Sequence, residues 1–261
     1  MLSSEVRCLY RRNQLVEVIC QLRFPEILSI GTQVPDAFQE AIRDAFPQYR
    51  RLQENLPPKV SNSGGQFALE KQTAAVNHQF ADSQGIWRIN LTSRFISLSC
   101  SRYHSWEEFA QKLDRPLAAF IRIYKPAYFE RVGLRHLNFI SRKDLQLEDV
   151  PFRELINSCY LGPLALEHVV EQSVTRCNVD LEFALRGGCR AKLHAGPGMV
   201  KRNGQNDPEV KFVWDQDLFL PGQLPVNLSA GALQTLHSQA YALFRGAITQ
   251  KLHEALEPQD L

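Results

Sequence analysis

The segment with the greatest concentration of chemically useful side chains reads Arg-Val-Gly-Leu-Arg-His-Leu-Asn over residues 131–138. Successive side chains of an extended chain point to opposite faces, so Arg131 and Arg135 share one face while His136 and Asn138 share the other with apolar neighbours. A polar group on an apolar face must be hydrogen-bonded if it is buried. We therefore expect His136 and Asn138 to organise the core or to line a pocket.

The two arginines of this segment have counterparts on neighbouring predicted strands. Together with Arg88 and Arg94, Arg131 and Arg135 would make a basic sheet face able to contact RNA phosphates. Two phenylalanines of the 129–140 strand fall on the same face and would let bases stack. Arginines at a helix-covered sheet edge also serve structural roles, and the pI near 8.2 lies below the range typical of nucleic-acid-binding domains. The sequence favours the structural role and keeps RNA binding as the alternative.

A pair of carboxylates, Asp215 and Asp217, would lie on one face of a continued strand and could share a divalent cation. Such a cation takes roughly six oxygen ligands, and two carboxylates supply too few of them. A solvated strand end is the favoured interpretation, and we predict no metal site.

The histidines do not form an evident catalytic group. His237 and His253 are 16 residues apart on one predicted helix, which separates them by about 24 Å, so they cannot act together. His104 beside Tyr103 could perform the acid–base work of a ribonuclease, but it has no evident partner in the sequence. The nucleophile elbow, the P-loop, the HExxH zinc motif and the dinucleotide-binding glycine pattern are all missing from the sequence. The residues therefore favour a non-enzymatic protein without a cofactor.

Composition limits the class of protein further. The chain has 261 residues, 44% of them hydrophobic and 22% charged, with a formal net charge of +2, which is ordinary for a globular protein. No apolar run approaches the roughly 20 residues that cross a bilayer, and residues 1–12 do not resemble a secretory signal. The six cysteines show no Cys-x-x-Cys pair, which predicts buried, reduced thiols rather than zinc ligands or disulfides. We expect a cytoplasmic protein.

The elements that must position these residues follow from periodicity. In the first part of the chain we expect a strand at 14–24, a helix at 36–46, an exposed loop at 47–65, and short antiparallel strands at 66–71, 74–80, 86–91 and 94–100. Ser105 and Glu108 form a capping box that opens a helix, which Pro116 should kink or split. A strand at 129–140 follows.

For the second part of the chain we predict a short helix at 151–159, a strand at 174–185, a return strand at 189–194, a mobile loop at 196–208 and a strand at 209–214. Ser229 should cap one long final helix at 230–256. Runs of strands followed by single helices indicate an α+β fold. We predict two coupled halves, 1–150 and 151–261, each an antiparallel sheet covered by a long helix.

Three segments in order, at 13–25, 131–138 and 236–249, resemble a sporadically distributed family of uncharacterised bacterial and archaeal proteins of similar length. One departure is Gln14, where the family usually has proline after the opening asparagine. The resemblance brings no catalytic residues. It implies a context, because such a patchy distribution is typical of genes in mobile or antiviral-defence loci, including accessory proteins beside type III CRISPR effectors.

These observations lead to two functional hypotheses. The first is a non-enzymatic accessory protein that binds another protein encoded in the same locus, because catalytic motifs are missing while arginines and aromatics suited to interfaces are plentiful. The second is an RNA-binding or RNA-processing protein that uses the arginine face. The residues proposed for binding are Arg88, Arg94, Arg131, Arg135, His136 and Asn138.

Overall fold

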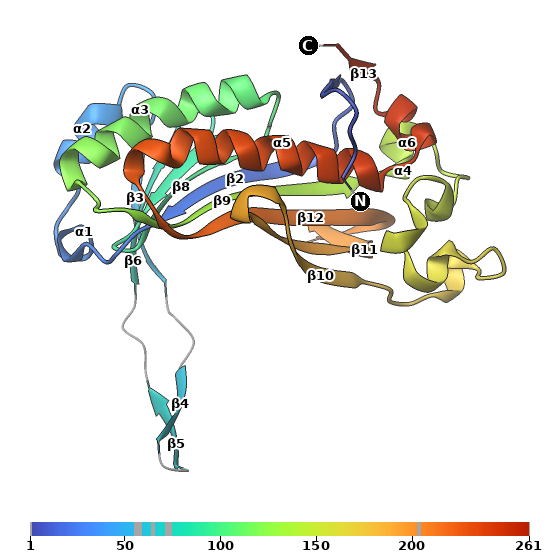
Figure 1. Cartoon of the computed structure of the whole chain (residues 1–261), viewed down its shortest axis with the longest axis horizontal. Helices are drawn as coiled ribbons and strands as arrows, with labels where there is room; N and C mark the ends of the chain where they lie inside the picture. The colour runs from blue at the N-terminus through green and yellow to red at the C-terminus, as the bar shows by residue number, and fades with distance from the viewer. Residues whose placement is uncertain (1, 55–58, 64–65, 71–74, 203–204, 261) are drawn as a thin grey trace.

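A nine-stranded antiparallel sheet forms the centre of the computed structural model, which describes residues 2–54, 59–63, 66–70, 75–202 and 205–260. The strands lie in the order β10-β11-β12-β9-β2-β8-β7-β6-β3 (Figure 1). Their bounds are β2 Leu15–Arg23, β3 Gln48–Glu54, β6 Ala75–Ala81, β7 Trp87–Leu91, β8 Phe95–Cys100, β9 Phe129–Ile140, β10 Val179–Ala184, β11 Arg190–Arg202 and β12 Gln205–Leu224. Two small pairs lie outside this sheet: β1 Leu9–Tyr10 with β13 Pro258–Gln259, and β4 Lys59–Ser63 with β5 Gln66–Glu70.

The two long helices, α3 and α5, lie side by side over one face of the sheet (Figure 1). The helices are α1 Leu28–Thr32, α2 Asp36–Ile42, α3 Trp106–Tyr124, α4 Arg142–Leu145, α5 Ser229–Ala247 and α6 Gln250–Ala255. Short 3-10 turns occupy Phe152–Glu154, Ser158–Tyr160, Gly162–Ala165, Glu171–Ser173, Arg186–Gly188 and Val226–Leu228. No helix in the described part of the chain is long and apolar enough to span a membrane.

The core lies between the helices and the sheet. Alternate residues of the central strand β9, among them Val132 and Leu134, are fully buried beneath the helices. Phe120 of α3 packs on Phe24 at the end of β2, with ring centroids 4.7 Å apart. The apolar stripe of α3 and the two-residue period of the strands thus meet in one continuous core.

The mixed α+β class is confirmed, but the layout in two halves is not. Strand β9, from the first predicted half, pairs with β2 on one side and with β12, from the second, on the other. Strands from both parts of the chain therefore share a single sheet. The apolar period identified the strands, but it does not say which strands become neighbours.

Several local predictions are confirmed. The strands β2, β6, β7, β8 and β9 lie within a residue or so of their predicted bounds. The side chain of Ser105 accepts a hydrogen bond from the backbone N–H of Glu108 and caps α3 as the capping box predicted. Helix α2 forms where predicted but ends at Ile42.

Other local predictions are wrong in instructive ways. The expected loop at 47–65 contains two strands, β3 and β4, and β3 pairs with β6. Residues 55–58 and 64–65 of that expected loop lie outside the described residues. The expected loop at 196–208 is the end of a long β11–β12 hairpin, in which Gly196 pairs with Val213; residues 203–204 lie outside the described residues. The glycine and proline residues of these segments suggested loops, but the segments instead pair with neighbouring strands.

The predicted helices also differ from those observed. Two 3-10 turns replace the helix at 151–159, and β10 is shorter than the strand expected at 174–185. Helix α3 runs through Pro116 without being divided. The long final helix is divided at Ile248 and Thr249, where Thr249 caps α6, and Ser229 begins α5 without capping it. Of the cysteines predicted to be buried, Cys159 is exposed and Cys8 and Cys177 are half-buried.

Candidate functional site

The sheet face opposite α3 and α5, here called the open face, carries three of the four predicted arginines. In β9 the side chains of Arg131 and Arg135 point to this face, while the even-numbered residues from Val132 to Ile140 lie beneath the helices. Arg135 lies opposite Ile19 of β2, which lies opposite Ser99 of β8, which in turn lies opposite Arg88 of β7. Three strand spacings of about 4.8 Å separate the backbones of Arg88 and Arg135 by about 14 Å.

Both arginines of β9 are paired with carboxylates of β12. The Nη2 of Arg131 donates to both carboxylate oxygens of Asp217, at 2.8 and 2.7 Å. Arg135 donates through Nε to one oxygen of Asp215 at 2.7 Å and through Nη2 to the other at 2.5 Å. These hydrogen bonds also raise the pKa of Arg135. Forked contacts of this kind fix the geometry of the charges and satisfy them.

The fourth arginine lies apart from the others. Arg94 lies in the turn between β7 and β8 and forms an ion pair with Glu26 at 2.9 Å. The hydrogen bond from Arg94 lowers the pKa of Glu26. The structure thus brings Arg131 and Arg135 together on the open face, keeps Arg88 farther along that face, and places Arg94 at the end of the strands.

These pairings bear on both predicted chemistries of the open face. The two guanidinium charges are balanced by two carboxylates, so they are not presented as free cations to a polyanion. Asp215 and Asp217 face arginines, and no group of three or more metal-ligating side chains occurs among the described residues. The geometry makes this part of the sheet a neutral surface of fixed ion pairs.

A shallow hollow of about 460 Å³ lies on the open face over β9, β10, β11 and β12. Its lining carries charges of both signs, including Lys192, Glu182 and His194. His194 Nδ1 lies 2.6 Å from Oδ1 of Asp180. Half-buried apolar side chains of the same face adjoin it: Ile19, Leu137, Phe139 and Val213. Charged and apolar groups therefore alternate over this surface.

The remaining predicted residues, His136 and Asn138, lie on the opposite side of the sheet and line a pocket, as one of the two alternatives predicted. The pocket has a volume of about 90 Å³ and lies between β9, β12, α5 and the N-terminal segment. Its polar lining also includes Gln216 and His237, which sequence reasoning did not place in a site. His104 lies at the same pocket. We call this cavity the histidine pocket.

The two buried histidines of the pocket are held as neutral rings. Burial, with a smaller contribution from the nearby His237, lowers the pKa of His136 to about 3. Burial and, to a smaller extent, the charge of Arg7 together lower the pKa of His237 to about 4. A neutral imidazole offers one N–H donor and one lone-pair acceptor. The pocket therefore presents hydrogen-bonding groups without net charge.

Most other polar groups of the pocket already have partners. Gln216 accepts a hydrogen bond from Trp214 Nε1 at 3.0 Å and donates one to the carbonyl of Ala240 at 3.1 Å. Arg7 forms an ion pair with Glu107. By contrast, Nδ1 of His136 and both ring nitrogens of His237 are buried without a hydrogen-bond partner among the described residues.

The pocket does not resemble an assembled catalytic site. Its thiol, Cys8, lies 3.4 Å from the hydroxyl of Tyr241, and the pocket lining contains no aspartate or glutamate that could orient a histidine as a base. Burial raises the pKa of Tyr103, which keeps its phenol protonated. The neutral imidazole and amide groups of the pocket can hold a molecule by hydrogen bonds.

Comparison with known proteins adds no family. No protein-family model and no curated protein matches the chain.

Proposed function

We propose that this chain is a non-enzymatic accessory protein that binds another protein through the open face of its sheet. The observation that supports this proposal is the surface around Arg135 and Asp215, where half-buried apolar side chains lie among charges that are already paired. Protein interfaces combine an apolar centre with polar groups whose hydrogen bonds are satisfied. Fixed ion pairs also need little reordering when a partner covers them.

The dimensions of the open face are sufficient for a stable complex. Nine strands at a spacing of about 4.8 Å extend over about 40 Å, and six residues along a strand add about 20 Å. The resulting area of about 800 Å² equals one side of a standard protein interface. The partner we propose is a protein encoded in the same locus, in keeping with the resemblance to a family whose patchy distribution is like that of genes in mobile or antiviral-defence loci, type III CRISPR loci among them.

RNA binding through the same face is the second candidate, supported by Arg23, Arg50 and Arg88, which are exposed there and have no carboxylate partner among the described residues. It is the weaker candidate, because Arg131 and Arg135 would first have to exchange Asp217 and Asp215 for phosphates. Without that exchange, the exposed arginines of this face that have no carboxylate partner among the described residues are Arg23, Arg50 and Arg88, which allow only a few phosphate contacts.

Co-expression of the tagged chain with the products of its neighbouring genes tests the proposal. We expect one stoichiometric partner by mass spectrometry and an absorbance ratio that excludes nucleic acid. Substitution of the open-face residue Leu137→Glu should abolish the complex. Val170→Glu is the matched control, since Val170 is 61% exposed and does not lie in the sheet.

Three results would contradict the proposal. A complex that survives Leu137→Glu would place the interface elsewhere, and a concentration-dependent dimer of the purified chain that Leu137→Glu disrupts would assign the face to a second copy. RNA retained without a partner protein would favour the second candidate. Circular dichroism of each variant establishes that it has folded.

A further inference from the structure

The histidine pocket has a feature that the proposed binding of a protein does not use. His136 and His237 are each 6% exposed, and three of their ring nitrogens have no partner among the described residues. Leaving a buried polar atom unsatisfied costs about 1–3 kcal/mol. Native proteins rarely contain several such atoms in one place unless another molecule satisfies them.

The pocket has room for such a molecule. A single water requires about 10–15 Å³ of cavity volume, so the 90 Å³ of the histidine pocket holds several waters or one small ring. Apolar side chains, among them Leu15 and Phe244, and the ring of Tyr103 line the same cavity. A mostly apolar wall with a few convergent polar groups is typical of a small-molecule site.

The charges around the pocket restrict the class of ligand. Both histidines are neutral at physiological pH, and the one arginine of the lining, Arg7, is paired with Glu107. An anionic ligand would find no free cation there, and burying an unpaired charge is strongly unfavourable. The amide of Asn138, 4% exposed, adds a donor and an acceptor on the same face of β9 as His136.

We propose that the histidine pocket binds a small uncharged ring compound, about the size of a pyrimidine base, that both donates and accepts hydrogen bonds. His136, His237 and Asn138 supply complementary donors and acceptors, and the apolar wall covers the faces of the ring. This site lies on the opposite side of the sheet from the open face, so it does not depend on the proposed protein partner.

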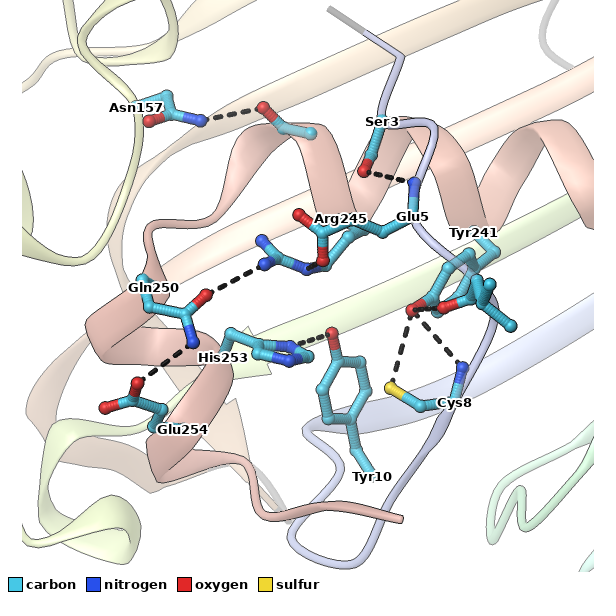
Figure 2. A network of polar contacts seen from close by, with 12 residues as sticks. Ser3, Glu5, Cys8, Tyr10, Asn157, Tyr241, Arg245, Gln250, His253 and Glu254 are labelled. Carbon is cyan, nitrogen blue, oxygen red and sulfur yellow. Dashed lines mark hydrogen bonds and ion pairs between the residues drawn. The ribbon is translucent and has the colours of Figure 1, made fainter. Parts of the chain in front are cut away.

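The N-terminal segment forms one wall of the pocket, to which it contributes Cys8, Tyr10 and Leu15. Figure 2 shows this segment tied to α5 and α6 by a series of polar contacts. Glu5 forms an ion pair with the buried Arg245 at 2.7 Å, and the hydroxyl of Tyr10 lies 2.9 Å from Nδ1 of His253. The hydroxyl of Tyr241 accepts a hydrogen bond from the backbone N–H of Cys8 at 3.3 Å. The segment is therefore an anchored wall of the pocket.

The test uses the full chain and four probes of similar size. Uracil and nicotinamide are uncharged rings that donate and accept hydrogen bonds, toluene is apolar, and benzoate is anionic. Binding is measured by saturation-transfer NMR and by the shift in melting temperature. Long-range ¹H–¹⁵N spectra follow the ring nitrogens of His136 and His237 directly.

We expect uracil or nicotinamide to bind, to raise the melting temperature and to shift the ring-nitrogen resonances of both histidines. His136→Leu and His237→Phe each remove ring nitrogens and should weaken binding by at least about tenfold, which corresponds to one lost hydrogen bond. His168→Gln is the matched control, because His168 is exposed and lies outside the pocket. If one of the two pocket variants does not fold, the other still decides the result.

The proposal is overturned if neither uracil nor nicotinamide binds at about 10 mM, where ligands of millimolar affinity are detected. Tighter binding of toluene would mean that the cavity is an apolar void. Tighter binding of benzoate, or binding of Zn²⁺ alone with the same shifts of both histidines, would assign the pocket to an ion. Equal binding by the variants would place the probe outside the pocket.

Discussion

His237 lies flat against Trp106, with ring centroids 4.6 Å apart and ring planes 7° from parallel. The contact joins α5 to α3 over the sheet, and Nε1 of Trp106 donates to Gln234 at 2.6 Å while the nitrogens of His237 have no partner among the described residues. The ring of His237 therefore stabilises the fold by packing, whereas its nitrogens oppose folding when the pocket is empty.

Two substitutions separate these contributions. His237→Ala removes the stacked ring and leaves a cavity, so we expect the free energy of unfolding to fall by about 2–4 kcal/mol. His237→Phe keeps a ring against Trp106 and removes the two unsatisfied nitrogens, so stability should be unchanged or higher by about 1–2 kcal/mol. Urea denaturation without ligand measures both changes. Equal destabilisation by Phe and Ala would show that the nitrogens are hydrogen-bonded.

The buried histidines predict a loss of stability in mild acid. The pKa of His136 is lowered to about 3 and that of His237 to about 4 in the folded chain, whereas a histidine in the unfolded chain titrates near 6.5. Between these values only the unfolded state takes up the proton. The free energy of unfolding is therefore at its full value above pH 6.5. As the pH falls below 6.5, it decreases by about 1.4 kcal/mol per pH unit for each histidine.

Urea denaturation between pH 7 and pH 5 checks this expectation. His78 and His253, whose pKa values are also lowered by burial, contribute in the same direction. The measurement therefore compares the natural chain with His237→Phe, which retains those two groups. The variant should lose about 1–2 kcal/mol less over this range. An identical pH dependence in the two proteins would mean that His237 is already exposed to protonation in the native state.

The geometry of the β11–β12 hairpin predicts that substitution by alanine has very different effects on stability at two nearby glycines. A Cβ at Gly196 would lie 2.3 Å from the backbone oxygen of Cys177 and 2.6 Å from Oδ1 of Asn178, whereas at Gly198 the nearest atom is 3.7 Å away. A backbone oxygen cannot rotate aside. Gly196→Ala should therefore destabilise the chain by about 2–3 kcal/mol, and Gly198→Ala by about 0.5 kcal/mol or less. Thermal denaturation of both variants measures the two losses of stability. Equal losses would contradict the close approach of Gly196 to the backbone oxygen of Cys177.

Periodicity predicted the central strands and α3 well, because each signal is local. The alternation in β9 spans the whole strand, and the Ser105 cap depends on a residue three positions away. The division of the final helix was missed because the apolar stripe continues across it. The break results from Ile248 pairing with the distant Ile156 and from Thr249 capping α6.

The candidate site was only partly predictable for the same reason. The pattern of β9 indicated that His136 and Asn138 face the core, which the structure confirms. Nothing local relates His136 to His237, which lies about a hundred residues later and reaches the pocket because α5 packs over β9 and β12. Likewise, the pairing of Arg135 with Asp215 depends on the register between β9 and β12, which the sequence does not specify.

The ion pairs of the open face predict how RNA binding would be gained. The double substitution Asp215→Asn and Asp217→Asn frees Arg131 and Arg135 while leaving their side chains in place. The double variant should bind a short single-stranded RNA more tightly than the natural chain at about 50 mM salt. The slope of log K against log salt concentration should be steeper by about 1.4, the increment for two phosphates. Fluorescence anisotropy over a salt series measures both.

A matched control separates the effect of freed arginines from that of net charge. Glu148→Gln with Asp149→Asn changes the net charge by the same two units at exposed positions outside the sheet and leaves the arginine pairs intact. If this control binds RNA as the first variant does, overall charge rather than the open face is responsible. RNA binding by the natural chain itself, with a slope that Arg131→Gln reduces, would show that phosphates displace the carboxylates and would make RNA, rather than a protein, the partner of this face.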